Sequence, residues 1–425
     1  MMEWILVFVF VIGYAAITLE HSIKIDKAAS ALLTGVLCWV VYVLATADKT
    51  LVATQLDEHM AGISQIVFFL LGAMVIVELI DAHDGFDIVT ERIRTTKKRS
   101  LLWILMPITF FLSAVLDNLT TTIVMVSLLR KIIADRDDRM LFAGMVIIAA
   151  NAGGAWSPMG DVTTTMLWTG GQISALNIIK MLFLPSVVCL MLPALVMHMR
   201  LKGNVETPVA EPEANKIPST PTERKWVFFT GLAVLLFVPV FKTVTHLPPF
   251  MGVLLGLGVM WVVTELIHGE KDQADRSPLS VVHALRKVDT PSILFFLGIL
   301  VAISALESAH LLVELAGWLD RTVGNITAIG ISIGFLSAVV DNVPLVAAAQ
   351  GMYTLDQYPH DHFFWEFLAY CAGTGGSALI IGSAAGVAAM GMENISFFWY
   401  LKRITPLAVL GYLGGAAVYV AMQAL

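Results

Sequence analysis

Three aspartates lie well inside apolar stretches of the sequence, where an ionisable side chain is costly. They are Asp117, Asp161 and Asp341, and no Lys or Arg lies at a comparable depth. Insertion scales put the cost of such a group at about 2.5–3.5 kcal/mol, so those that occur usually have a task. Because a cavity with acids and no bases attracts cations and repels anions, the three residues predict a site for a cation.

Oxygen-bearing side chains cluster around the first of these aspartates. Asn118 follows Asp117 directly, and threonines occupy positions 120–122. Carboxylate, amide and hydroxyl oxygens together are hard ligands that suit hard cations. The alternative is that Asp117 only caps the helix that follows it, by accepting hydrogen bonds from the first amides of that helix.

The stretch 149–168, "AANAGGAWSPMGDVTTTMLW", places helix-breaking residues in the middle of an apolar run. Its glycines and proline should interrupt the helix, and unwound backbone then offers carbonyl oxygens and half-helix ends to an ion. Asn151 precedes the interruption, and Asp161, Thr163 and Thr164 follow it. A simple kink would explain the glycines and the proline but not the aspartate.

These polar groups belong to a very apolar chain. Of its 425 residues, 57% are hydrophobic and 14% are charged, whereas a globular protein is about 45–50% apolar and about 25% charged. This composition excludes a soluble enzyme, a disordered chain and a disulfide scaffold. The balance of 26 Lys and Arg against 33 Asp and Glu argues against a nucleic-acid partner.

No enzyme signature of the HExxH, GxSxG or Walker type occurs in the sequence. We therefore expect neither an enzymatic activity nor a cofactor, and any transport would be driven by an ion gradient. The cysteines, Cys38, Cys189 and Cys371, stand singly inside apolar runs and are interpreted as buried thiols.

Ten apolar runs are long enough to span a membrane, which takes about 20 residues. They are 2–19, 28–47, 60–80, 140–169, 177–199, 226–244, 250–267, 290–306, 363–391 and 404–423. Two further stretches, 100–130 and 325–352, are too long for one span and too short for two, and each carries Asp-Asn near its middle. Such a stretch fits a re-entrant hairpin, whose polar tip is tolerated where it lines a cavity in the protein.

Loop charges agree with this topology. With two hairpins, the ten spans put both termini outside, and of the 26 Lys and Arg only Lys49, Lys180, Lys242 and Arg321 then lie outside. Such a bias follows the positive-inside rule. Two short full spans in place of each hairpin would leave the same Lys and Arg residues on each side of the membrane.

The two halves of the chain repeat each other. "FLSAVLDN" (111–118) recurs as "FLSAVVDN" (335–342), and "NAGGAWSPMGD" (151–161) recurs more faintly as "GTGGSALIIGS" (373–383). Because each half has an odd number of spans, the second copy is inverted relative to the first. Inverted repeats with broken helices are the architecture of secondary transporters.

We therefore predict an all-α polytopic membrane protein with two inverted-topology repeats of five transmembrane helices, each repeat with a re-entrant hairpin and a discontinuous helix. The predicted parts are a first repeat at 1–201, a cytoplasmic Pro-rich linker at 202–225 and a second repeat at 226–425.

Four stretches of the chain resemble signatures of the NhaD-type sodium/proton antiporters of the ion transporter superfamily. They are "GAMVIVELIDAHDGF", "SAVLDNLTTT", "NAGGAWSPMGDVTTTMLW" and "SAVVDNVPLV", and the resemblance covers essentially the whole chain. It implies a secondary transporter that exchanges Na⁺ and Li⁺ for H⁺. It also implies a homodimer in the lipid bilayer of the bacterial inner (cytoplasmic) membrane.

The resemblance also implies which residues bind the ions and protons. They are Asp117, Asn118, Asn151, Asp161, Thr163, Thr164, Ser337, Asp341, Asn342 and Ser377. Among these, Asp117, Asn118, Asp161 and Thr163 are expected to bind Na⁺, in competition with the proton.

Two other functions stay open at this stage. A Na⁺-coupled carrier of a small anion, such as a dicarboxylate or arsenite, would need a cationic or donor-rich pocket. A channel or a non-transporting scaffold would not need paired inverted repeats. The third span ends in three titratable residues, Glu78, Asp81 and His83. They are interpreted either as solvated charges at the membrane interface or as a proton path or pH sensor.

Overall fold

The computed structural model describes residues 2–18, 20–90, 93, 95–206, 208, 219–269, 271–339 and 341–424. Residues 209–218, the middle of the predicted linker, lie outside the described residues. Within the described part the regular elements are helical, and eight helices are long and apolar enough to cross a membrane. The chain is therefore an all-α, multi-pass membrane protein.

The helices of the first repeat follow the predicted spans. They are α1 (Met2–Thr18), α2 (Glu20–Ile23), α3 (Lys27–Ala45), α4 (Lys49–Ala82), α5 (Asp87–Thr90), α6 (Lys98–Leu116), α7 (Asn118–Ile132), α8 (Arg136–Ala155), α9 (Val162–Thr169) and α10 (Ala175–Arg200). The long α4 extends well beyond the predicted span 60–80. Its N-terminus is fixed by Asp48, whose carboxylate accepts from the amides of Thr50 and Leu51.

The second repeat has the same order of long helices, hairpin and broken helix, with additional short helices between them. It consists of α11 (Pro221–Thr245), α12 (Pro249–Ile267), α13 (Gln273–Arg276), α14 (Val281–Lys287), α15 (Thr290–Ser308), α16 (Leu311–Thr322), α17 (Ile326–Ser337), α18 (Asn342–Met352), α19 (Phe363–Gly375), α20 (Ala384–Glu393), α21 (Phe397–Arg403) and α22 (Thr405–Gln423). The discontinuous helices are α8 with α9 and α19 with α20. The short α16 was not predicted from the sequence.

Helices α6 and α7 form a hairpin whose two ends contact one short segment, residues 203–206. The Lys98 amide donates to Gly203 O at 3.2 Å, and the Ala134 amide donates to Glu206 O at 2.7 Å. The entrance and the exit of the hairpin therefore lie on the same side of the protein. The hairpin tip lies inside the protein, where Asn118 is 5% exposed and donates to Asn151 and Asp161 at the break between α8 and α9. The chain therefore turns back within the protein, as in a re-entrant hairpin.

Helices α17 and α18 form the second hairpin, which enters from the opposite side. The Tyr353 hydroxyl, just after α18, donates to Asp320 at 3.1 Å, just before α17. Gln350, near the end of α18, contacts Gln172 ahead of the N-terminus of α10, whereas the first hairpin contacts the segment that follows α10. Because α10 spans the membrane, the two hairpins enter from opposite faces, as an inverted repeat requires.

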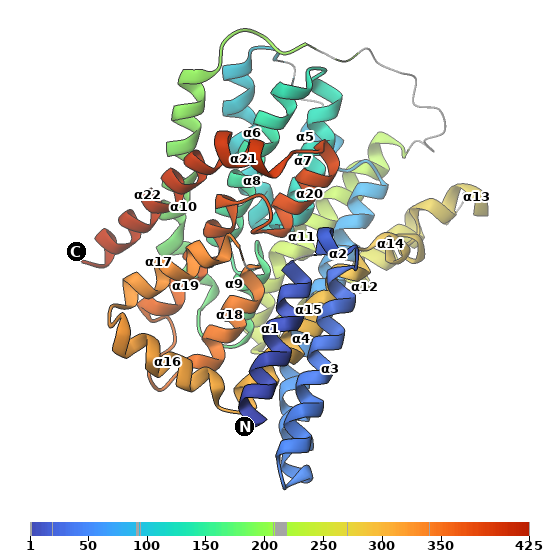
Figure 1. Ribbon diagram of the computed structural model, residues 1–425. Coiled ribbons are helices and arrows are strands. Elements are labelled where there is room, and N and C mark those ends of the chain that lie inside the picture. Colours follow the sequence, from blue (N-terminus) through green and yellow to red (C-terminus); the bar gives the residue numbers. More distant parts are fainter. Residues whose placement is uncertain are drawn as a thin grey trace.

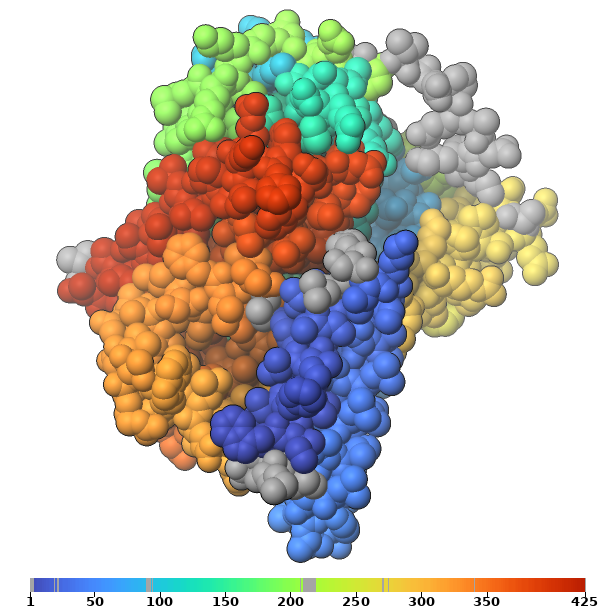
Figure 2. All heavy atoms as spheres, viewed as in Figure 1, coloured from blue at the N-terminus to red at the C-terminus, as the bar shows by residue number. Residues whose placement is uncertain are grey.

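The helices pack into two groups (Figure 1). The lateral bundle consists of α1, α3, α4, α11, α12 and α15, and the hairpin bundle consists of α6 to α10 and α17 to α22. On one face, α1 and the α16–α18 segment border an apolar groove of about 680 Å³, between the blue and orange surfaces of Figure 2.

Small residues hold the two repeats together inside the lateral bundle. Gly298 of α15 lies directly against the backbone of Ala31 and Leu32 in α3, and Gly35 of α3 lies against Gly298 O. In a membrane, helices associate through such close packing, because lipid supplies no hydrophobic force between them.

Replacing Gly298 by Ala should therefore destabilise the protein. The new Cβ would lie 2.5 Å from backbone atoms of Ala31 and Leu32, and overpacking of this kind costs about 1–3 kcal/mol. Thermal unfolding of the purified protein in detergent measures the effect. Gly258→Ala in α12 is the matched control, since nothing lies within 4 Å of its Cβ. Equal melting temperatures of the two variants would contradict this packing.

A pair of buried histidines joins the ends of α4 and α12. The His83 Nδ1–H group donates to Leu79 O at 2.7 Å, so the His83 Nε2 atom accepts from His268 Nε2–H at 2.8 Å. Burial lowers the pKa of both rings, and that of His268 falls to about 4, helped by His83 itself. Both rings are therefore neutral when they are paired.

The hydrogen bond between His83 and His268 should stabilise the protein less at acidic pH. Because the pKa of His268 is lower in the folded protein, the unfolded chain takes up a proton at a higher pH than the folded chain does. The free energy that the histidine pair contributes to stability is therefore complete above pH 6.5 and is lost as the pH falls from 6.5 to about 4. Melting temperatures measured across this range should fall by several degrees more in the natural protein than in the double variant His83→Gln, His268→Gln. Parallel curves for the two proteins would show that the pair does not titrate in this way.

Candidate functional site

Asp161 is the centre of a hydrogen-bond network between the two repeats. Its carboxylate is 1% exposed and follows the interruption between α8 and α9, where Asp161 caps the N-terminus of α9. The amide and hydroxyl of Thr163 donate to Oδ1 at 2.8 and 2.7 Å. The Asn118 side chain donates to Oδ2 at 2.6 Å, and Asn342 donates to both oxygens at 3.3 and 3.4 Å.

The two asparagines reach Asp161 because each is the first residue after a hairpin tip. Asn118 begins α7 and Asn342 begins α18, so each hairpin delivers one amide to the same carboxylate. The broken helices come close enough because glycines face the hairpins. A Cβ on Gly153 would overlap Phe110 O of α6, and one on Gly375 would overlap Gly334 O of α17.

Asn151 extends the network into the second broken helix. Its Nδ2 group donates to Ser377 Oγ at 2.8 Å and to Ser383 Oγ at 3.0 Å, and its Oδ1 atom accepts from Asn118 at 3.1 Å. Ser383 was not among the predicted site residues. The repeat offers a signal for it, because Ser383 is the counterpart of Asp161 in the alignment of 151–161 with 373–383.

Asp117 and Asp341 lie at the hairpin tips and cap the helices that follow. The Asp117 carboxylate accepts from Thr120 N at 2.7 Å and from Thr120 Oγ1 at 3.0 Å, and Asp341 accepts from Val343 N at 3.2 Å. Asp117 has φ 103°, a conformation that a residue other than glycine adopts only under strain. Both carboxylates lie within electrostatic range of Asp161.

Two of the predicted residues bond to the backbone and not to the central carboxylate. The Thr164 hydroxyl donates to Asp161 O at 2.8 Å, and the Ser337 hydroxyl donates to Ala372 O at 2.8 Å. In the first repeat Ser113 makes the bond equivalent to that of Ser337, with Ala150 O at 2.6 Å. These serines attach each hairpin to its own broken helix.

Of the four residues expected to bind Na⁺, Asn118 and Thr163 both donate to the third, Asp161. The fourth, Asp117, precedes Asn118 but directs its carboxylate to Thr120. The partners of the Asp161 carboxylate are neutral amides and hydroxyls. A negative charge held in this way, without a basic partner among these groups, can take up a proton or a cation.

The sequence did not indicate the role of Lys242. Its ammonium group, on α11 of the lateral bundle, donates to Trp168 O at 2.6 Å and lies 4.5 Å from the centre of the Trp168 ring. Trp168 is at the C-terminal end of α9, where a cation is favourable because of the helix dipole. Helix α9 therefore has Asp161 at its N-terminus and Lys242 at its C-terminus, and the lysine connects the two bundles.

Comparisons with known proteins give consistent results. Residues 8–366 match the family described as "Citrate transporter". The chain is 50% identical over 416 residues to Sodium/proton antiporter 1 of Arabidopsis thaliana, covering 97% of this chain and 71% of that protein. It is 30% identical over 434 residues to the Na⁺/H⁺ antiporter NhaD of Vibrio cholerae, covering 95% of this chain and 88% of the other.

A solved structure shares the fold. The YdaH transporter of Alcanivorax borkumensis superimposes with a TM-score of 0.57, covering 90% of each chain at 16% sequence identity. This likeness concerns the arrangement of helices, which in this chain comprises the hairpins and broken helices described above.

The contact between Asn118 and Asp161 should be measurable as a coupling energy. Asn118→Ala and Asp161→Asn, tested singly and together for thermal stability, should be non-additive by about 0.5–3 kcal/mol, as expected for residues in one hydrogen-bond network. Asn325→Ala, which removes the exposed cap of α17, should be additive with Asp161→Asn. If the stability effects of Asn118→Ala and Asp161→Asn were also additive, the hydrogen-bond network would be contradicted.

Proposed function

Because the chain belongs to the citrate transporter family, and within it to the NhaD-type ion transporters, we propose that it exchanges Na⁺ for H⁺ across a membrane. The observation that carries this proposal is the buried Asp161 carboxylate, which neutral groups from both repeats surround. The names of the relatives in Arabidopsis and Vibrio support it.

Na⁺ and H⁺ would use the same carboxylate. An isolated carboxylate in a low-dielectric site is unstable, so it binds either a proton or a cation. The amides of Asn118 and Asn342 donate to Asp161; after rotation about χ2 they would offer oxygen atoms to a bound cation. Thr163 Oγ1 would remain within reach of the ion. Li⁺, also a hard cation, would be accepted at the same oxygens.

The other acids would have separate tasks. Asp117 would share the cation with Asp161 once its side chain turns away from Thr120, and the strained backbone at Asp117 favours such a change. Asp341, at the tip of the second hairpin, would couple or gate the exchange. Asn151 and Ser377 would hold the two broken helices at the distance that the ion requires.

Alternating access would come from movement of the hairpin bundle against the lateral bundle. The contact between Lys242 and Trp168 crosses from one bundle to the other, so it would have to break during this movement. The two repeats 1–201 and 226–425 both contribute helices to each bundle, with the linker 202–225 between them. Transport therefore would not be a motion of one repeat against the other.

The cellular setting remains part of the proposal. A homodimer in the lipid bilayer and a location in the bacterial inner membrane, with both termini outside, are predictions from the sequence. Relatives such as Sodium/proton antiporter 1 are plant proteins, so the membrane in which this chain operates needs a direct localisation experiment.

The family description "Citrate transporter" gives one reason to consider an anion carrier. An anion would need a cationic group in the site, and the ammonium of Lys242 is bound to Trp168 at the far end of α9. The charged group at the centre of the site is the Asp161 carboxylate, which is negative, and its hydrogen-bond partners are neutral. Cation exchange is therefore the better supported function.

Dye-reported ΔpH in proteoliposomes tests the proposal, with NaCl, LiCl, KCl or a citrate salt added at alkaline pH. Na⁺ and Li⁺ should release protons in the natural protein, and Asp161→Asn should abolish the response because it removes the charge but retains the helix cap. Asp117→Asn should reduce it strongly for the same reason.

Asp48→Asn, another capping aspartate on the exposed end of α4, is the control and should retain full activity. Full Na⁺ response of Asp161→Asn would remove this residue from the mechanism. Uptake of labelled citrate without a cation response would establish the anion carrier instead.

A further inference from the structure

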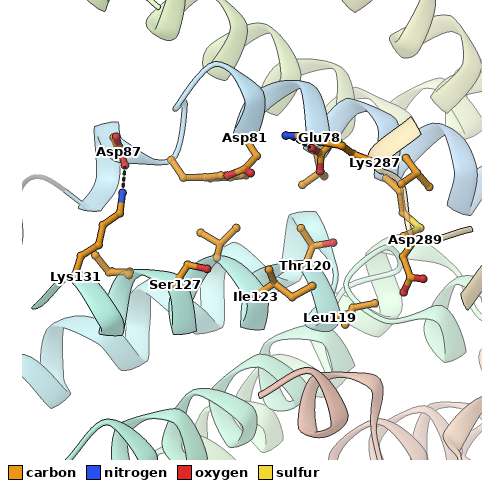
Figure 3. A pocket seen from close by; sticks show the side chains of 16 residues that line it. Glu78, Asp81, Asp87, Leu119, Thr120, Ile123, Ser127, Lys131, Lys287 and Asp289 are labelled. Atoms are coloured by element: carbon orange, nitrogen blue, oxygen red, sulfur yellow. Dashed lines mark ion pairs between the residues drawn. The ribbon is translucent and has the colours of Figure 1, made fainter. Parts of the chain in front are cut away.

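Cavities of different character lie along the boundary between the lateral bundle and the hairpin bundle. The cavity of about 190 Å³ between α4 and α7 is lined by charged side chains, among them Glu78, Asp87 and Lys131 (Figure 3). The groove of about 680 Å³ between α1 and α18 is apolar and opens on the surface that Figure 2 shows. This groove therefore suits an apolar ligand.

The walls of the groove come from both bundles. Val7, Phe10 and Tyr14 of α1 lie on one side, Leu345 and Ala348 of α18 lie on the other, and α15 and α16 complete the lining. Helices α1 and α15 belong to the lateral bundle, whereas α18 is part of the second hairpin. A ligand in the groove would therefore contact both bundles at once.

The groove extends from the face at which the second hairpin enters to the tip of that hairpin. Trp4, near the N-terminus of α1, and Trp318, on the neighbouring α16, line its outer part (Figure 1). Tyr14 lines its inner part, and the Tyr14 hydroxyl lies next to the backbone of Asp341. From position 4 to position 14 a helix rises about 15 Å. The groove thus reaches about half way through a hydrocarbon core of about 30 Å.

The groove opens on a surface that faces lipid. Beside it, the large apolar side chains of Phe8, Val11 and Ile12 on the apolar helix α1 are exposed, so the bilayer surrounds this helix. An empty groove would leave its lining side chains without van der Waals partners. An acyl chain can enter from the adjacent bilayer and supply these contacts. A flexible chain also fits walls that belong to two bundles better than a rigid helix of a second copy, because it adapts to their spacing.

The outer part of the groove has the chemistry of a site for a lipid head group. Tryptophans are typical of membrane interfaces, and Trp4 and Trp318 are exposed. Among the described residues that line the groove, Glu314 is the charged one. Helix α16 as a whole carries Glu314, Asp320 and Arg321, an excess of one acid. A carboxylate beside indole rings attracts an ammonium group and disfavours a head group that is only anionic.

We propose that the groove binds one phospholipid. An acyl chain lies between α1 and α18, and a head group that bears an ammonium, as in phosphatidylethanolamine, lies at Glu314, Trp4 and Trp318. The bound chain contacts both bundles and ends beside the hairpin tip that carries Asp341. The identity of the transported ion does not enter into this inference.

Lipid binding to the purified protein in detergent tests the site, with native mass spectrometry as the readout and dioleoyl phosphatidylethanolamine or dioleoyl phosphatidylglycerol as the added lipid. The natural protein should retain one phosphatidylethanolamine per chain, with a Kd several-fold lower than that for phosphatidylglycerol. Ala348→Trp and Val7→Trp fill the groove from opposite walls, so each should raise the Kd for phosphatidylethanolamine several-fold. Val259→Trp, at an exposed position of α12, is the matched control and should bind as the natural protein does.

Unchanged affinity in both groove variants, or an equal loss of affinity in Val259→Trp, would overturn the site. Glu314→Gln should remove the preference for phosphatidylethanolamine over phosphatidylglycerol. A preference that persists in Glu314→Gln would overturn the position of the head group.

Photocrosslinking locates the acyl chain without any variant. Phosphatidylethanolamine with a diazirine in its acyl chain, in nanodiscs that contain the natural protein, should label residues 7–14 and 345–348 more strongly than the exposed side of α12. Equal labelling of the groove and of α12 would overturn the proposal. Cross-links between two copies across an unlabelled groove would also overturn it, because a second copy of the chain would then fill the groove.

Discussion

One buried carboxylate determines how the two repeats must fit together. Asp161 is 1% exposed and is held by an amide from each hairpin, Asn118 and Asn342, and by Thr163 from its own helix. A buried charge is costly unless its hydrogen bonds are made. The hydrogen bonds of this carboxylate therefore bring both hairpin tips to one place, next to the break between α8 and α9.

The rest of the fold positions the groups that surround Asp161. Interrupted helices place backbone and side-chain oxygens inside the membrane, and glycines such as Gly153 and Gly375 let the hairpins approach them. The serines Ser113 and Ser337 fasten each hairpin to its own broken helix. Around this assembly, the tightly packed α3 and α15 join the repeats into a lateral bundle.

Much of this arrangement could be predicted from the sequence, and some of it could not. Helix breakers and embedded polar residues indicated the broken helices and the hairpin tips, because few structures tolerate such residues in lipid. The contact of Asn151 with Ser383 joins residues 232 positions apart and depends on the packing of four helices. The direction of the Asp117 side chain depends on its φ of 103°, and an aspartate at a tip could equally cap a helix or face an ion. The extra length of α4 follows from a single capping residue outside the apolar run.

If Na⁺ and H⁺ compete for Asp161, Na⁺ binding must displace protons, and proton release from the purified protein measures this competition. Na⁺ is added to weakly buffered protein in detergent at mildly alkaline pH, and the protons released are counted against the Na⁺ that binds. We expect saturable proton release that accompanies Na⁺ binding and that Asp161→Asn eliminates. Na⁺ binding without proton release, or undiminished release in Asp161→Asn, would contradict it.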